Sequence, residues 1–320
     1  MPRVEELRMI VQVSRMYFEK GIRQPQIADM LGLSQSMVSR LLARAKEEDI
    51  VRISVSVPEG VYTELEEELV KKYGLRDAIV VDCGNEDDEH WIQKEIGAMA
   101  AYYLESVIKQ NEVIGISSWS STLLALVDAM HQLQNKTGIS VVQILGGVGS
   151  PSARTHANWL TSRFAYLVNG TSVFLPAPGI VGSAAASKIL MEDIYVQQAI
   201  NLFDHITMAL VGIGAVEPSP LLAESGNIFS AEELEMLRKN GAVGDVLLRF
   251  FDANGKPVET DLNNRVISMT LNQLTRVHRA IGVAGGSRKF EAIRGALRGQ
   301  LLNVLITDRY TASRLVSESR

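Results

Sequence analysis

The sequence predicts an α/β protein with an N-terminal (winged) helix-turn-helix followed by a Rossmann-like parallel-sheet domain. Three observations support this fold class. Residues 24–44 have the apolar spacing of two short crossing helices, and the chain from Asp77 onward alternates β-branched runs with helical stretches. The length of 320 residues also exceeds one usual hydrophobic core. We therefore expect two domains, residues 1–57 and 58–320, divided at the breakers in Pro58-Glu59-Gly60.

Residues 24–44, QPQIADMLGLSQSMVSRLLAR, meet the local requirements of helix, turn and helix. Ile27, Val38 and Leu41 belong to one apolar face. Gly32 suits the positive φ of a helix end, and Ser34 suits the N-cap of the second helix. Residues 4–20 show a further helical pattern and would supply a supporting helix. An ordinary pair of surface helices has the same apolar spacing, so the outward face distinguishes the two interpretations.

The outward face of the second helix carries hydrogen-bonding side chains and no carboxylate. Its members are Gln35, Ser36, Ser39, Arg40 and Arg44. From Gly21 to Lys46 four basic residues oppose one acidic residue, although the formal net charge of the whole chain is −5. A major groove accepts such a face, and local positive charge suits phosphate contacts. The pattern favours double-stranded DNA as a partner, with Arg40 reading a base and Arg44 contacting a phosphate.

Residues 51–57, VRISVSV, alternate apolar and polar side chains and predict a half-buried strand. Such a strand after a helix-turn-helix is similar to the wing of a winged-helix domain, in which Arg52 would reach a phosphate. A strand that merely closes the small core explains the pattern equally well.

Charge and cysteine content limit the function of the larger domain. Residues 1–57 hold nine Lys and Arg against seven Asp and Glu, and the remainder holds 23 against 30. We therefore do not expect the larger domain to bind nucleic acid. Cys83 is the single cysteine, which excludes an intrachain disulfide and a cysteine-rich metal site. A charged start and the lack of a long apolar run predict a cytoplasmic protein without membrane contact.

The second domain begins with a predicted helix. Thr63 and Glu66 form a capping-box pattern, and Glu68 precedes Lys72 by four residues, the stabilising order for a surface ion pair. This helix is either a hinge or dimer contact, or a solvated helix packed on its own domain.

Strands and helices then alternate, which implies parallel strands with crossover helices. The predicted strands are AIVVD, EVIGIS, ISVVQIL, TSVFLPA, ITMALVGIG and RAIGVAGG, and the predicted helices are 88–110, 121–133, 152–168, 183–204 and 230–240. Asn254-Gly255 signals a hairpin, so we expect a late antiparallel insertion.

Glycine and small polar residues follow three of the predicted strands, where ligands of open parallel sheets bind. The segments are 117–122 (SSWSST), 146–150 (GGVGS) and 282–287 (GVAGGS), the last followed by Arg288 and Lys289. The first opens a helix, whose N-terminus favours an anion such as phosphate. Each loop alone is explained by packing, whereas three together favour a site for one small ligand.

A nucleotide cofactor is not expected. GGVGS and GIGAVE (212–217) both lack the complete dinucleotide fingerprint, and no GxxxxGK[ST] phosphate loop occurs. A regulator that reads a dinucleotide is therefore a weaker alternative, and we predict neither a cofactor nor a metal.

The whole chain resembles the SorC/DeoR type of bacterial sugar-responsive transcription regulators. The resemblance rests on YFEKGIRQPQIADMLGLSQSMVSRLLARA, GISSWSSTL, QILGGVGSPSARTHANWL, LPAPGIVGS, GNIFSAEELEMLRKNGAVGDVLLRFFDANGKPV and GVAGGSRKFEAIRGALRGQLLNVLITD. It implies a helix-turn-helix joined to an effector domain similar to sugar-phosphate isomerases. It also implies a sugar or sugar-phosphate effector and assembly as a homodimer or homotetramer.

The resemblance places the effector site on matching segments of this chain. The implied residues are Ser118, Trp119, Ser120, Ser121, Thr122, Gly147, Gly149, His156, Asn158, Asp245 and Lys289, with Asp308 in a further matching stretch. For His156 a place on a helix surface is as good an explanation. Trp119 departs from the family pattern, which has a small residue there, and a ring would either stack on a sugar or shrink the pocket.

Two functions follow. The first is a DNA-binding regulator of a carbohydrate-utilisation operon, controlled by a sugar, polyol or sugar phosphate. The second is a sugar-phosphate isomerase or deaminase with an attached DNA-binding head. The predicted loops offer hydroxyls and glycine amides instead of a clustered acid and base, which favours the regulator and no catalytic residues.

Overall fold

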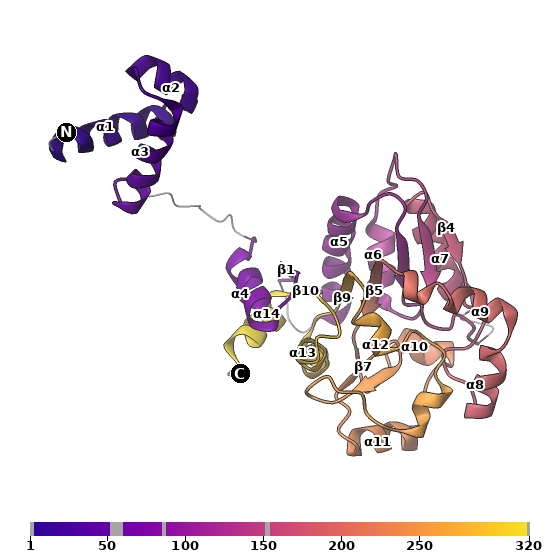
Figure 1. Ribbon diagram of the computed structural model, residues 1–320. Coiled ribbons are helices and arrows are strands. Elements are labelled where there is room, and N and C mark those ends of the chain that lie inside the picture. Colours follow the sequence, from indigo (N-terminus) through magenta and orange to yellow (C-terminus); the bar gives the residue numbers. More distant parts are fainter. Residues whose placement is uncertain (1–2, 52–59, 85–87, 151–153, 319–320) are drawn as a thin grey trace. The chain divides into compact units, whose positions relative to one another are not determined.

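The computed structural model describes residues 3–51, 60–84, 88–150 and 154–318 of the chain (Figure 1). The chain forms two compact units that divide between Pro58 and Glu59. The predicted strand at 51–57, including Arg52, lies outside the described residues apart from Val51 itself.

The first unit is a helical domain built around a small apolar core. Its elements are α1 (Arg3–Ser14), the π-helix η1 (Arg15–Glu19), α2 (Gln24–Leu31) and α3 (Gln35–Glu47). Ile10, Val13, Ile27 and Val38 are fully buried in this core, as the apolar spacing predicted for the latter two. The predicted helix at 4–20 is present as an α-helix that widens into one π-helical turn.

The second unit is organised around a seven-stranded parallel sheet in the order β1-β10-β9-β5-β2-β3-β4. The strands are β1 (Asp77–Val81), β2 (Val113–Ile116), β3 (Ser140–Gln143), β4 (Thr171–Val173), β5 (Met208–Gly212), β9 (Arg279–Val283) and β10 (Val304–Asp308). The sheet confirms the predicted α/β class. β10 was not predicted, although it lies between β1 and β9.

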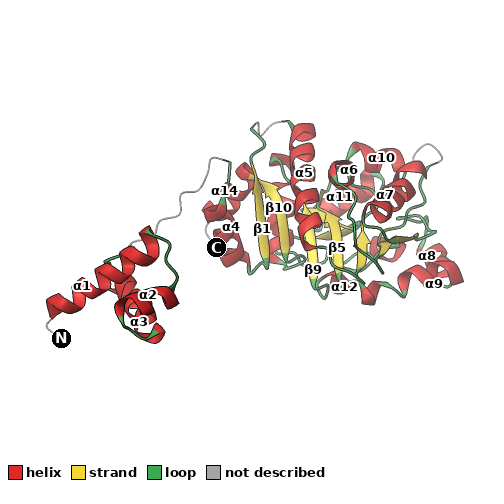
Figure 2. Ribbon diagram, turned by 90° about the horizontal axis from the view of Figure 1, so that it is seen from above, coloured by secondary structure: helices red, strands yellow, loops and turns green. Residues whose placement is uncertain are grey.

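Helices cover both faces of this sheet (Figure 2). The larger ones are α4 (Thr63–Tyr73), α5 (Glu89–Val107), α6 (Ser121–Ala129), α7 (Arg154–Leu167), α8 (Ala184–Met191), α9 (Ile194–Ile200), α11 (Ala231–Lys239), α13 (Phe290–Arg298) and α14 (Arg309–Ser317). Shorter ones are α10 (Pro220–Ser225), α12 (Leu271–Leu274) and the 3₁₀ turns η2 (Phe203–His205), η3 (Asp261–Arg265) and η4 (Ser287–Lys289). No described helix has the length and apolar character needed to cross a membrane.

Alternating strand residues divide the interior into two cores. In β5, Met208 and Leu210 pack with the apolar residues of α5, α6 and α7, whereas Ala209 and Val211 pack with those of α4, α9, α12 and α14. This is the period of two that places successive side chains on opposite faces of a sheet.

A small antiparallel sheet follows β5. It consists of β6 (Gly214–Ala215), β7 (Gly244–Val246) and β8 (Arg249–Phe251), in that order. The predicted turn at Asn254-Gly255 is present beyond β8, where the Gly255 N–H donates to the Asp252 carbonyl. The structure adds a second tight turn between β7 and β8, at Leu247 and Leu248.

One predicted helix was wrong in extent. Residues 183–204 form α8 and α9 instead of one helix, because Asp193 adopts extended backbone (φ −66°, ψ 136°) and caps α9. Its Oδ1 accepts hydrogen bonds from the N–H groups of Tyr195 and Val196.

Candidate functional site

The first unit presents α3 as the predicted recognition helix. Gly32 ends α2 with a φ of 64°, and the Ser34 Oγ accepts a hydrogen bond from the Met37 N–H at the start of α3. Gln35, Ser36 and Ser39 are exposed, and so is Arg40. These exposed residues form a surface of hydrogen-bonding side chains on α3.

Arg44 differs from the other predicted contact residues because its guanidinium pairs within the unit. It contacts the Glu6 carboxylate, and its Nη2 lies 2.6 Å from Glu48 Oε1. Hydrogen bonds to Glu48 and then Glu6 raise the pKa of Arg44. A phosphate contact would therefore require this side chain to exchange partners.

The second unit contains a polar cavity at the topological switch point of its parallel sheet. From β2 the chain continues outward through β3 and β4, whereas from β5 it continues in the opposite direction through β9 and β10. Ligands of open α/β sheets bind at such a point, beyond the carboxyl ends of the strands. The cavity lies there, between the segments that follow β2, β5 and β9.

The segments that line the cavity come from five parts of the chain. They are Ser117 and Trp119–Ser121, Gly212–Ala215 with Glu217–Ser219 and Leu222, Asp245 with Leu247 and Leu248, and Arg288 with Lys289; Leu145 completes the lining. The cavity measures about 60 Å³. Because one water needs about 10–15 Å³ on this scale, the enclosed space suits a small polar molecule.

One wall of the cavity is the N-terminus of α6. Ser120 is the N-cap, and its Oγ accepts a hydrogen bond of 3.3 Å from the Leu123 N–H. A Cβ at Gly212 would lie 2.8 Å from this Oγ, so a glycine is needed where β5 ends. The helix dipole and free N–H groups at this end favour an anionic group.

Asp245 adds a buried carboxylate to the lining of the same cavity. Its Oδ2 accepts a hydrogen bond of 2.9 Å from the Leu248 N–H, and a Cβ at Gly214 would lie 2.1 Å from its Oδ1. Burial raises the pKa of Asp245 to about 6, against the lowering effects of the Leu248 N–H and of Lys289. A carboxylate held in this way is suited to accept hydrogen bonds from ligand hydroxyls.

The turn beside Asp245 has an unusual backbone. Leu247 and Leu248 have φ of 58° and 60°, values that residues with a Cβ rarely adopt, and both side chains are buried. Such residues cost roughly 1–3 kcal/mol each and cluster at functional sites. The Asp245 carboxylate and apolar packing hold this turn against the cavity.

The basic residues lie where the sequence predicted them. Lys289 lines the cavity and is the N-cap residue of α13, and burial followed by the charge of Arg288 lowers the pKa of Lys289. Arg288 Nε donates a hydrogen bond of 2.7 Å to Glu89. Arg288 is therefore engaged by a carboxylate of its own domain, and Lys289 is the basic side chain that we expect to contact a ligand.

The predicted site residues separate into two groups. Trp119, Ser120, Ser121, Asp245 and Lys289 line the cavity, whereas Ser118, Thr122, Gly147, Gly149 and Asn158 do not. His156 is a residue whose side chain lies outside the described part of the chain. A ligand role stays a prediction for the residues of both groups.

Trp119 explains why the GGVGS loop is separate from the cavity. Its indole Nε1 donates a hydrogen bond of 2.9 Å to the Gly146 carbonyl, and only 5% of the residue is exposed. A Cβ at Gly149 would lie 3.0 Å from the Trp119 ring. The ring therefore fills the space between the first two loops, consistent with a reduced pocket.

Asn158 and Ser118 also have internal partners. Asn158 Oδ1 accepts a hydrogen bond from the Gln143 side chain, and the Ser118 Oγ donates to the Leu145 carbonyl. The loop after β5 and the leucine turn were missed as cavity-lining segments. The position of 212–217 at a strand end is the sequence signal for this segment, which the incomplete dinucleotide fingerprint does not carry.

No group of three or more His, Cys, Asp or Glu residues with metal-site geometry occurs in the described part of the chain. The single thiol, Cys83, is buried, and burial raises its pKa to about 12. It is therefore a poor nucleophile.

Comparisons with known proteins agree with this architecture. Residues 60–317 match the family described as "Putative sugar-binding domain". The chain is 34% identical over 314 residues to the deoxyribonucleoside regulator of Bacillus subtilis (strain 168), covering 98% of this chain and 99% of that protein. The full-length sorbitol operon regulator SorC of Klebsiella pneumoniae is 29% identical, with a TM-score of 0.73 and coverage of 98% and 100%.

A helix-turn-helix unit joined to a parallel-sheet domain with a polar switch-point cavity defines a class, the ligand-responsive transcriptional regulators. Both of these relatives are regulators, and their alignments extend through the first unit as well as the second. The chain belongs to the SorC/DeoR-type family of sugar-binding transcriptional regulators. This confirms the resemblance inferred from the sequence.

Proposed function

We propose that this protein binds operator DNA of a carbohydrate-utilisation operon through α3, under the control of a sugar, polyol or sugar phosphate in the switch-point cavity. The observation that carries the proposal is the cavity itself. The N-terminus of α6 and Lys289 provide an anion-binding side, and Asp245 provides an acceptor for hydroxyls. A phosphorylated polyhydroxy compound has these two kinds of group in one small molecule.

We assign DNA binding to the first domain, residues 1–57. We assign effector binding and assembly to the second domain, residues 58–320. A palindromic operator requires two recognition helices in successive major grooves. We therefore propose a homodimer or homotetramer as the active form.

An enzymatic function, a sugar-phosphate isomerase or deaminase, is the second candidate. Asp245 is the observation that favours it, because a buried carboxylate with a pKa of about 6 resembles a general base. Two observations favour the regulator instead. The relatives are named as regulators, and the described part of the cavity lining adds hydroxyls, Glu217 and two basic side chains to Asp245, with no histidine among these described residues.

The proposal is tested first with a thermal-shift screen of pentoses, hexoses, polyols and their phosphates. Fluorescence anisotropy with a duplex selected from a random pool then measures operator affinity with and without the compounds that bind. We expect at least one compound to change operator affinity. Steady product formation from the same compounds would instead support the enzyme.

Lys289→Met is the matched test of the cavity. We expect operator affinity without the compound to be retained and the response to be lost, because the anion-binding side loses its cation. Lys188→Met, on the exposed face of α8, should respond normally. A normal response of Lys289→Met would remove this cavity from the mechanism.

A further inference from the structure

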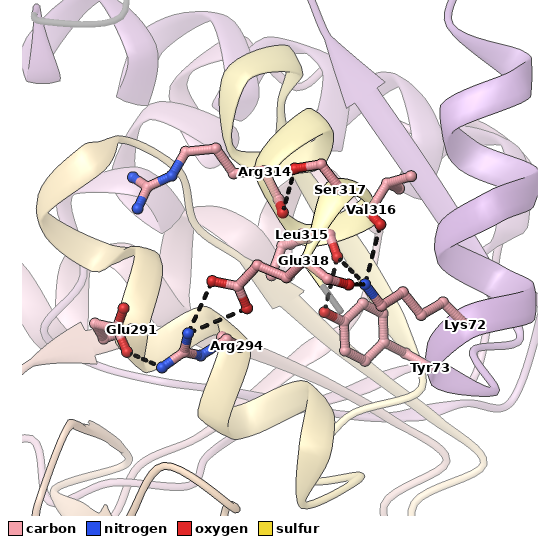
Figure 3. Close-up of polar contacts among 9 residues, drawn as sticks. All are labelled: Lys72, Tyr73, Glu291, Arg294, Arg314, Leu315, Val316, Ser317 and Glu318. Atoms are coloured by element: carbon pink, nitrogen blue, oxygen red, sulfur yellow. Dashed lines mark hydrogen bonds and ion pairs between the residues drawn. The ribbon is translucent and has the colours of Figure 1, made fainter. Parts of the chain in front are cut away.

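Lys72, near the end of α4, closes a polar cluster at the C-terminal end of α14 (Figure 3). Its Nζ donates hydrogen bonds to the carbonyls of Leu315 (2.7 Å), Val316 (3.0 Å) and Glu318. The Tyr73 hydroxyl donates a further bond of 3.1 Å to the Leu315 carbonyl. An ammonium group at this position satisfies terminal carbonyls and complements the negative end of the helix dipole.

This arrangement replaces the surface ion pair that the sequence predicted for Lys72. The Lys72 ammonium group instead points toward α14 and donates its hydrogen bonds to the carbonyls there. The side chain therefore connects two helices that are far apart in the sequence. α4 is also the first helix after the segment that joins the two units.

The same cluster continues from α14 to α13. Arg294 Nη1 lies 2.8 and 3.1 Å from the two carboxylate oxygens of Glu318, and the guanidinium also contacts Glu291. The guanidinium of Arg314 lies 3.7 Å from the centroid of the buried Phe290 ring. α13 and the end of α14 are thus held together by one carboxylate and one cation–π contact.

The other end of α13 reaches the cavity. Lys289 is its N-cap residue, and a Cβ at Gly244 would lie 2.3 Å from Ala292 Cβ, so α13 packs directly against the strand that carries Asp245. A ligand that contacts Lys289 and Asp245 would therefore hold the N-terminal end of α13 and the strand β7 against which α13 packs.

We propose that Lys72 is a positioning residue of the ligand response, which couples the cavity through α13 and the end of α14 to α4. The inference rests on the proposed function, because it requires a ligand in the cavity. The contacts of Lys72 and of Arg294 with Glu318 form the continuous link between α4, α14 and α13 on which the proposal stands.

Hydrogen exchange on the full chain tests this coupling, with inorganic phosphate and D-ribose 5-phosphate as probes. In the wild type we expect a probe to protect 117–123 and 287–298 and also to change exchange in 315–318 and 63–73. In Lys72→Met the protection at the cavity should remain, and the change in 63–73 should disappear. Lys72→Arg, which keeps a donor to the carbonyls, should restore it.

Lys71→Met is the matched control, because Lys71 is exposed on the same helix. It should behave as the wild type. Tyr73→Phe removes a single bond to the same carbonyl and should weaken the response partly, which keeps the test available if Lys72→Met unfolds. Melting temperatures identify a merely structural role. Such a role would lower the stability of Lys72→Met, but the probe would still change exchange in 63–73 whenever it protects the cavity segments.

Three outcomes would count against the inference. A change in 63–73 that persists in Lys72→Met would overturn the coupling, and so would a wild-type response confined to the cavity segments. Absence of protection at 117–123 and 287–298 with both probes would overturn the cavity as the ligand site, and the coupling with it. Operator affinity gives a second readout, because allosteric factors are typically about 5- to 150-fold and the factor should approach one in Lys72→Met.

Discussion

Replacing Asp245 by Asn should stabilise the second unit at neutral pH. Asp245 is 8% exposed, and its carboxylate accepts one hydrogen bond from the Leu248 N–H. Asn has nearly the same shape and keeps an oxygen for this bond. The substitution therefore removes the buried charge while it leaves the support of the leucine turn in place.

The magnitude follows from the pKa of this carboxyl, which burial raises from 3.8 to about 6. The folded protein holds the proton more tightly than the unfolded chain does. The resulting stabilisation is complete below pH 3.8 and is lost as the pH rises to about 6. Because one pH unit corresponds to about 1.4 kcal/mol, Asp245→Asn should be more stable than the wild type by about 3 kcal/mol above pH 7.

Urea unfolding followed by tryptophan fluorescence measures this difference. All three tryptophans, Trp91, Trp119 and Trp159, lie in the second unit, so the signal reports on the domain that contains Asp245. The free energy of unfolding is compared between the variant and the wild type from pH 4.5 to pH 8. Asp128→Asn, at an exposed carboxylate, serves as the control and should stay within about 0.5 kcal/mol at every pH.

The pH dependence is the decisive part of this measurement. A gain in stability that grows from pH 4.5 to pH 8 supports a desolvated carboxylate. An equal difference at all pH values, or a less stable variant at pH 8, would show that the ionised carboxylate stabilises the fold, and the reasoning would fail.

Three further substitutions test the two surfaces. Arg40→Ala should weaken operator binding by about 1–3 kcal/mol in an anisotropy titration if the side chain reads a base; unchanged affinity would remove it from the interface. Arg44→Met should reduce the slope of log affinity against log salt concentration by about one, and an unchanged slope would leave Arg44 only its internal ion pairs. Gly214→Ala should abolish the ligand response in the same titration, because its Cβ would lie 2.1 Å from Asp245 Oδ1. Gly182→Ala, with no atom within 4 Å, is its control, and a normal response of Gly214→Ala would contradict the assigned role of the carboxylate.

The helix-turn-helix was predictable because its determinants are local. Gly32 ends α2 and Ser34 caps α3 through contacts that span a few residues, so the sequence itself carries the signal. The sheet was predictable as a class for a related reason, since buried strands and crossover helices alternate along the chain. β10 was missed although VLITD is buried throughout and resembles the apolar runs that were predicted as strands; its place in the sheet depends on its partners β1 and β9, which are defined only in the folded chain.

The turn at Leu247 and Leu248 shows where local rules fail. Two-residue hairpins with positive φ favour Asn and Gly, so a Leu-Leu pair carries no turn signal. Burial of both side chains and the bond from the Leu248 N–H to Asp245 impose the conformation instead. These contacts depend on tertiary structure, and no sequence pattern reveals them.

The sequence predicted part of the cavity lining but not all of it. Strand ends predicted the edge of the sheet at which the cavity lies, and Ser120, Asp245 and Lys289 all line it. Which loops meet depends on strand order, and β5 lies beside β2 although seven of the described elements separate them in sequence. Trp119 then fills the space toward Gly149, an effect of side-chain packing that loop composition does not indicate.

The cavity combines features that each raise the free energy of the unliganded domain. Asp245 is ionised at neutral pH in a buried position, Lys289 is a partly buried cation, and the adjacent turn holds two leucines at positive φ. A ligand with hydroxyls for the carboxylate and an anionic group for the lysine satisfies both charges at once. Its binding would therefore favour whichever arrangement of β7 and α13 brings the two groups together. That differential stabilisation is what a ligand must supply to shift a two-state equilibrium. It arises at the N-terminal end of α13, whereas Arg294, further along the same helix, contacts Glu318 at the end of α14.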